Sequence, residues 1–280
     1  MPLAGRGALQ LGERCLVMGI LNVTPDSFAD ARSLLDPAEA LAAALDMQTT
    51  GADLIDVGGE SSRPGAEEIS SDQELSRVLP VLDALKGRLE VPISIDTTKA
   101  EVARAAIAAG AAIVNDVSGL RRDPAMARTV AETGAALILM HGRGSSKTMY
   151  AEAEYADVVA EVIEALRSGL RCATEAGVRL EQVIVDPGVG FAKRSWHSYG
   201  VLARLSELAS ALERPVLVGP SRKSFLRAAV GGRPASERDW GTAAAVTAAV
   251  LAGAHLVRVH AVAEMTQVVR VAEEIRRAEG

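Results

Sequence analysis

Eight short apolar runs alternate along the chain with longer segments of helical pattern. The runs occupy residues 16–22, 52–58, 91–96, 111–117, 135–141, 182–188, 215–221 and 255–260. They are rich in Val, Ile and Leu and lack polar–apolar alternation, which is typical of parallel strands covered on both faces. Eight strand–helix units in about 250 residues predict an α/β fold of the (β/α)8 TIM-barrel type. An open doubly wound sheet is the alternative.

The ends of the predicted helices carry capping signals. Asp36 precedes Pro37, which predicts an N-cap followed by a first-turn proline, and Gly51 is the expected stop. Residues 71–74 (SDQE) predict a capping box at the start of the next helix. Pro80 lies inside that helix and should kink it.

The amino-acid composition indicates which classes of protein this chain can belong to. The 280 residues are 49% apolar and 24% charged, so we expect one globular domain over residues 1–280, with residues 1–15 as a short N-terminal extension. Two distant cysteines, Cys15 and Cys172, form no disulfide framework and favour a cytoplasmic location. The net charge of −6 gives no basic footprint for nucleic acid. No uninterrupted apolar span approaches about 20 residues, so no membrane partner is expected either.

A polar residue recurs at the carboxyl end of every apolar run. The set comprises Asn22, Asp56, Asp96, Asn115, Asp116, His141, Asp186, Ser221, Arg258 and His260. The strand ends of a barrel meet on one face, where active sites are built, so the recurrence predicts a functional site. Taken singly, Asp56 is open to a second interpretation as a loop cap. Asp116 is better explained as a buried carboxylate that accepts loop amides.

Two loops have the composition of anion sites. Residues 59–65 (GESSRPG) offer hydroxyls, a guanidinium and mobile glycines, and residues 220–224 (PSRKS) place two cations and two hydroxyls where a helix should start. Together with Arg258 and His260 they predict a cation cluster of phosphate size. The chain has no GxxxxGK[ST] or GxGxxG motif, and its four histidines lack metal-ligand spacing, so ATP, NAD and zinc are not indicated.

The motifs at the strand ends resemble those of the dihydropteroate synthase family of folate biosynthesis. They are NVTPDSF (22–28), DVGGESSRPG (56–65), SIDT (94–97), NDVSG (115–119), DPGVGFAK (186–193), GPSRKSFL (219–226) and RVH (258–260). The resemblance implies that the methylene carbon of 6-hydroxymethyl-7,8-dihydropterin pyrophosphate is transferred to the amine of 4-aminobenzoate. It also implies that pyrophosphate and 7,8-dihydropteroate are released, with Mg²⁺ as cofactor.

The resemblance also implies roles for the matching residues. The pterin contacts would be Asp96, Asn115, Met140, Asp186, Phe191 and Lys223. The pyrophosphate contacts would be Asn22, Arg63, Arg258 and His260, with Asn22 also a ligand of Mg²⁺. The 4-aminobenzoate contacts would be Phe28, Ser62, Arg63 and Ser221. Asp30, Lys223, Arg258 and His260 would act in catalysis, with Asp30 stabilising the cationic pterin as pyrophosphate leaves.

The chain departs from the family pattern at three places. Residues 29–32 read ADAR where the family commonly has SDGG, which should stiffen the first loop. Ala261 stands where an Asp usually follows the histidine, and Ser62 stands where Thr is frequent. The alternatives are therefore a non-catalytic pterin-binding homologue, or a methyltetrahydrofolate–corrinoid methyltransferase, which would need no pyrophosphate cluster. We expect a homodimer and competition by sulfonamides.

Aromatic residues are few and unevenly placed. They make up 3% of the chain, and the predicted strands contain none. All eight rings lie after strand ends, on the side where the substrate is expected. Phe28 and Phe191 are therefore predicted to line the site, whereas Trp240 is predicted to pack on a helix.

Overall fold

The computed structural model describes residues 1–5, 7–24, 35–63 and 65–278. The predicted site residues Phe28 and Asp30, and the family departures at residues 29–32, lie outside the described residues.

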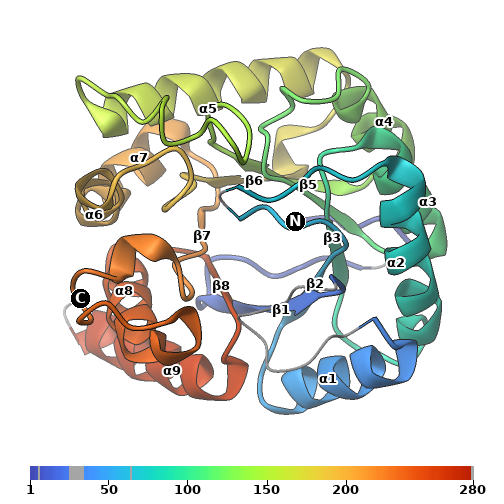
Figure 1. The fold of residues 1–280 in the computed structure, drawn as a ribbon, viewed down its shortest axis with the longest axis horizontal. Helices are drawn as coiled ribbons and strands as arrows, with labels where there is room; N and C mark the ends of the chain where they lie inside the picture. Colours follow the sequence, from blue (N-terminus) through green and yellow to red (C-terminus); the bar gives the residue numbers. More distant parts are fainter. Residues whose placement is uncertain (6, 25–34, 64, 279–280) are drawn as a thin grey trace.

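Eight parallel strands form one sheet around a central axis (Figure 1). They are β1 (Leu16–Asn22), β2 (Leu54–Gly58), β3 (Ile93–Asp96), β4 (Ile113–Asp116), β5 (Ala136–Met140), β6 (Val183–Asp186), β7 (Leu217–Val218) and β8 (Leu256–Val259). The order is β6-β5-β4-β3-β2-β1-β8-β7, and a bridge between Val185 and Val216 joins its two ends. Sequential order with β8 beside β1 is that of a barrel, so the TIM-barrel prediction is confirmed.

Helices surround the sheet (Figure 1). Most connect one strand to the next, two lie between β6 and β7, and the last follows β8. They are α1 (Pro37–Thr49), α2 (Ser71–Leu85), α3 (Ala100–Ala109), α4 (Met126–Thr133), α5 (Val158–Glu175), α6 (Ser195–Ala203), α7 (Leu205–Leu212), α8 (Asp239–Leu251) and α9 (Val262–Ala278). None of these described helices combines the length and apolar character needed to cross a bilayer.

The helix caps follow the sequence signals with one correction. The Asp36 side chain accepts the Ala38 N–H at 2.8 Å, as predicted. The capping box of α2 uses Ser70 and Gln73, so the predicted register at residues 71–74 was wrong by one residue. Two serines are adjacent there: Ser70 takes the extended N-cap conformation, and Ser71 is the first residue of the helix.

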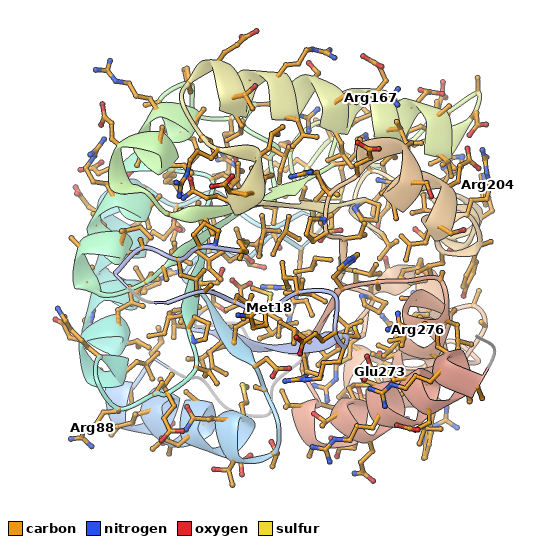
Figure 2. All side chains as sticks on the ribbon, turned by 180° about the vertical axis from the view of Figure 1, so that it is seen from behind. Met18, Arg88, Arg167, Arg204, Glu273 and Arg276 are labelled. Carbon is orange, nitrogen blue, oxygen red and sulfur yellow. The ribbon has the colours of Figure 1, made fainter. Side chains whose placement is uncertain are left out.

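Two apolar layers lie on the two sides of the sheet. The inner cluster gathers residues near the starts of the strands, including Met18, Leu54, Ile138 and Ile184, and Met18 lies near the middle of the barrel in Figure 2. Leu9 joins the same cluster, because residues 7–9 pair with residues 1–3 in a hairpin bridged between Pro2 and Ala8. That hairpin covers the amino-terminal end of the barrel, which leaves the opposite end, where the strands finish, open for a site.

Candidate functional site

Two adjoining cavities open at the carboxyl ends of the strands. The β8 cavity has a volume of about 400 Å³, and the β4 cavity, toward β4 and β5, has about 380 Å³. Their walls share Glu60, Ser61, Ser62, Asp96, Met149 and Phe191. The two cavities therefore form one divided cleft of the size that small ligands occupy.

The structure brings most of the predicted site residues to this cleft. Those lining the β8 cavity are Asn22, Ser62, Arg63, Asp96, Phe191, Ser221, Lys223, Arg258 and His260. Asn115, Met140 and Asp186 are buried at the ends of their strands and line neither cavity. The cleft thus has cations on its β8 side and buried polar groups at the strand ends beneath it.

A buried ion cluster links three strands under the β8 cavity. The Arg258 guanidinium donates from Nε to Asp56 Oδ2 at 2.6 Å and from Nη2 to Asp96 Oδ2 at 2.8 Å. Asn115 Nδ2 donates to the same Asp56 oxygen at 3.0 Å. Asp56 is therefore a partner of Arg258 and not a loop cap. Burial raises the pKa of Asp96 to about 7, although the Arg258 charge opposes this shift.

Asp186 and Lys223 lie beside the loop that follows β6. Asp186 Oδ1 accepts the Gly188 N–H at 2.7 Å, and Lys223 Nζ donates to the Val189 carbonyl at 2.8 Å. The same Nζ lies 4.3 Å from the centre of the Phe191 ring. Burial raises the pKa of Asp186 and lowers that of Lys223 to about 8, and the attraction between the two charges opposes both shifts. The site therefore brings the carboxylate and the aromatic face of the loop after β6 together with a lysine that follows β7.

His260 is held by a hydroxyl group. Its Nδ1 lies 2.9 Å from Ser221 Oγ, and its backbone N–H donates to the same oxygen at 3.1 Å. Burial and the neighbouring arginines keep the pKa of His260 well below its usual range, so the imidazole is neutral. Asp116 has the structural role expected of it, since its two oxygens accept the Ser118 and Leu120 N–H groups at 2.8 Å.

Comparison with known proteins identifies the family. Residues 18–260 match the family described as pterin binding enzyme. The chain belongs to this pterin-binding enzyme family. A dihydropteroate synthase from Synechocystis is 44% identical over 98% of this chain and 94% of that protein, and one from Mycobacterium leprae is 46% identical over 91% of each.

Solved structures of dihydropteroate synthases share the fold closely. The Yersinia pestis enzyme in complex with a sulfonamide drug has a TM-score of 0.90 at 40% identity, over 94% of this chain and 95% of that one. The Burkholderia cenocepacia enzyme complexed with 7,8-dihydropteroate has a TM-score of 0.88 at 40% identity, over 100% and 97%. The family resemblance predicted from the motifs is therefore confirmed.

Several lining residues of this pterin-binding barrel were missed by sequence reasoning. Tyr150 reaches across the mouth, where its hydroxyl lies 2.8 Å from Ser224 Oγ. Glu60 is held by Lys99, whose Nζ also pairs with the fully buried Glu74. Ser224 and Glu60 stand inside motifs that we quoted, so closer attention to those motifs would have found them. Tyr150 stands in a loop with no motif. Its place after a strand end predicted the substrate side of the barrel, and the fold places it on the wall of the β8 cavity.

Proposed function

We propose that this protein is a dihydropteroate synthase. It would join the methylene carbon of 6-hydroxymethyl-7,8-dihydropterin pyrophosphate to the amine of 4-aminobenzoate and release pyrophosphate. The observation that carries the proposal is the division of the cleft, with buried carboxylates at the strand ends and the cations Arg63, Lys223 and Arg258 on the wall of the β8 cavity. This polarity matches a substrate with a hydrogen-bond-donating ring at one end and two phosphates at the other.

The carboxylates would hold the pterin ring. Asp186 would accept two N–H groups of the amino-pyrimidine edge, in charge-assisted hydrogen bonds each worth roughly 1.5–3 kcal/mol. Asp96 and Asn115 would bind the remaining polar edge, and Lys223 would donate to the ring's acceptor atoms. Phe191 and Met140 would contact its faces, and Phe191 already lies under the Lys223 ammonium.

The cations would stabilise the departing pyrophosphate. Arg258 and Arg63 line the β8 cavity, and the neutral His260 presents its second ring nitrogen away from Ser221. An aniline is a weak nucleophile, so the barrier should fall mainly through stabilisation of the leaving group and of the cationic pterin. Asp30 is proposed to stabilise that cation. The nitrogen of 4-aminobenzoate then forms the new C–N bond and loses a proton.

Magnesium is proposed as the cofactor, with Asn22 as its protein ligand. Asn22 lines the β8 cavity, and its side-chain oxygen lies with Asp96 Oδ2 near Gly58. Within the described part of the chain, His, Cys, Asp and Glu side chains form no group of three that would hold a metal alone. One amide oxygen fits an ion that keeps most of its waters and binds substrate phosphates, and the ion would neutralise charge on the leaving pyrophosphate.

The second substrate would enter between the loops. Ser62 and Arg63 lie on the cleft wall shared with Phe191, and Phe28 is proposed to complete this pocket for 4-aminobenzoate. Ser221 lines the same cavity, although its hydroxyl already contacts His260. Sulfonamides would compete here because they have the shape of 4-aminobenzoate.

A homodimer in the cytoplasm is proposed as the working form. Trp240 on α8 is 89% exposed, so the prediction that it packs on a helix was wrong. Val271 on α9 is 61% exposed, so these helices carry apolar surface that a second copy would cover. Light scattering on the purified protein measures the mass, and a single-chain mass would reject the dimer.

The test of the proposed function is direct. The purified protein is given dihydropterin pyrophosphate, Mg²⁺ and 4-aminobenzoate, and pyrophosphate release is measured. No release above background in a folded sample would favour the non-catalytic homologue. Methyl transfer independent of pyrophosphate would favour the methyltransferase. Asp186→Asn should weaken pterin binding roughly tenfold to a hundredfold, and the exposed Asp83→Asn is the matched control.

A further inference from the structure

Lys193 is a fully buried lysine whose hydrogen-bond partners are all neutral. Its side chain is 1% exposed. Its Nζ lies 2.8 Å from His141 Nδ1 and donates to the carbonyls of Gly188 and Phe191 at 3.2 Å each. Burial lowers the pKa of Lys193 well below its usual range. Burying this amine costs free energy that an apolar side chain would not, so the position needs a reason beyond packing.

The loop that Lys193 holds has an unusual backbone. Gly188, Gly190 and Ala192 all have positive φ angles, of 66°, 79° and 46°. Ala192 pays a steric cost for this conformation that glycine does not. The loop carbonyls are bound from outside by side chains, because Lys223 donates to Val189 and the Tyr155 hydroxyl donates to Ala192. Lys193, which belongs to the loop itself, donates to two further carbonyls, those of Gly188 and Phe191.

The two carbonyls that accept from Lys193 belong to residues that contact or carry the groups proposed to bind the pterin ring. The Gly188 N–H donates to Asp186 Oδ1 at 2.7 Å, while the Gly188 carbonyl accepts from Lys193. Gly188, whose N–H orients the Asp186 carboxylate, is therefore held at both its N–H and its carbonyl. The second carbonyl belongs to Phe191, whose ring lines both cavities.

His141 holds the lysine in place. Burial keeps the pKa of His141 well below its usual range, so its imidazole is neutral. In the tautomer that carries the proton on Nε2, the Nδ1 lone pair accepts from the Lys193 Nζ. The Nδ1 acceptor therefore persists at neutral pH and fixes the direction of the Lys193 Nζ.

We propose that Lys193, oriented by His141, is a positioning residue that sets Asp186 and Phe191 for the pterin ring. The inference rests on the proposed function, because it names what holds the ring-binding groups of that same site. Lys193 itself contacts no substrate. It acts through Gly188 and the Phe191 backbone.

The experiment compares two ligands in the same samples. Binding of 7,8-dihydropteroate, which contains the pterin ring, and of inorganic pyrophosphate, which does not, is titrated by calorimetry with wild type, Lys193→Met and Lys86→Met. Lys86 is the matched control, because it caps the far end of α2. Lys193→Met should bind dihydropteroate about tenfold to a hundredfold more weakly, with pyrophosphate affinity within about twofold of wild type.

Two outcomes overturn the inference while the proposed function stands. One is a Lys193→Met protein that binds dihydropteroate as wild type does. The other is an equal loss for both ligands, which marks a general structural role. If the wild type binds no dihydropteroate, the proposed function fails and this inference fails with it.

A second pair of variants covers the case in which Lys193→Met does not fold. His141→Gln keeps an acceptor for Lys193, whereas His141→Leu removes it. Dihydropteroate affinity should be lower in His141→Leu than in His141→Gln, with pyrophosphate affinity equal in the two. Equal dihydropteroate affinity would overturn the inference.

Discussion

Ser221 binds His260 through both the side chain and the backbone of the histidine. One hydroxyl oxygen lies 2.9 Å from His260 Nδ1 and accepts the His260 N–H at 3.1 Å. The residue immediately after that histidine is Ala261, where the family resemblance predicts an aspartate. A serine from the preceding strand end thus takes over the orientation of the ring.

Ser221→Ala should lower the activity through His260. Loss of the hydroxyl frees rotation of the imidazole, and we expect kcat/KM for pyrophosphate release to fall about tenfold, the usual order for one lost orienting contact. Ser221→Thr keeps the hydroxyl and should retain most of the activity. Full activity in Ser221→Ala would show that the ring needs no such support.

Activity should depend on pH through Asp96 and Lys223. Burial raises the pKa of Asp96 to about 7, so below that pH the carboxyl is protonated and accepts pterin N–H groups poorly. Burial lowers the pKa of Lys223 to about 8, so above that pH its charge is lost. The profile of kcat/KM should therefore be a narrow bell between these values. Asp96→Asn should remove the acid limb, and an acid limb that persists in this variant would assign it to another group.

Lys99 should stabilise the folded protein because it neutralises the buried Glu74 carboxylate. Glu74 is fully buried, and Lys99 pairs with it and with Glu60. Lys99→Met leaves a buried carboxylate without its cation, and we expect the free energy of unfolding in urea to fall by about 3 kcal/mol. Adding Glu74→Gln should recover most of the loss. Arg128→Met, at the exposed pair with Glu132, is the control and should change stability little. A Lys99→Met protein as stable as wild type would contradict the argument.

Ala261 is a poor residue for its place in the fold. Its carbonyl accepts the Met265 N–H at 3.0 Å, which makes it the N-cap of α9. Ala261→Asp should raise the free energy of unfolding by about 1 kcal/mol, because an aspartate side chain satisfies a first-turn N–H. Ala261→Asn caps without a charge and should give a similar gain. No gain in either variant would mean that those N–H groups already have partners.

Sequence reasoning found the fold and most of the site for one physical reason. Parallel strands bring their carboxyl ends together, so polar residues at those ends identify the mouth of a barrel before any contact is known. The side-chain contacts within the site could not be predicted from the sequence. The pairing of Arg258 with Asp56 joins positions 202 residues apart and needs β8, β1 and β2 side by side. Lys193 reads as a loop cation in the sequence, and only the structure shows that it is buried.

The absence of rings from the strands has a spectroscopic consequence. Trp196 is 64% exposed and Trp240 is 89% exposed, and the chain has no other tryptophan. Both indoles already face water in the folded protein, so their emission should change little when the barrel unfolds. Trp196 begins the segment that follows the loop of Asp186 and Phe191, and its ring lies 5.3 Å from that of His197. Intrinsic fluorescence should therefore report events at the substrate-facing loops while remaining almost blind to the core, whose unfolding is better followed by circular dichroism.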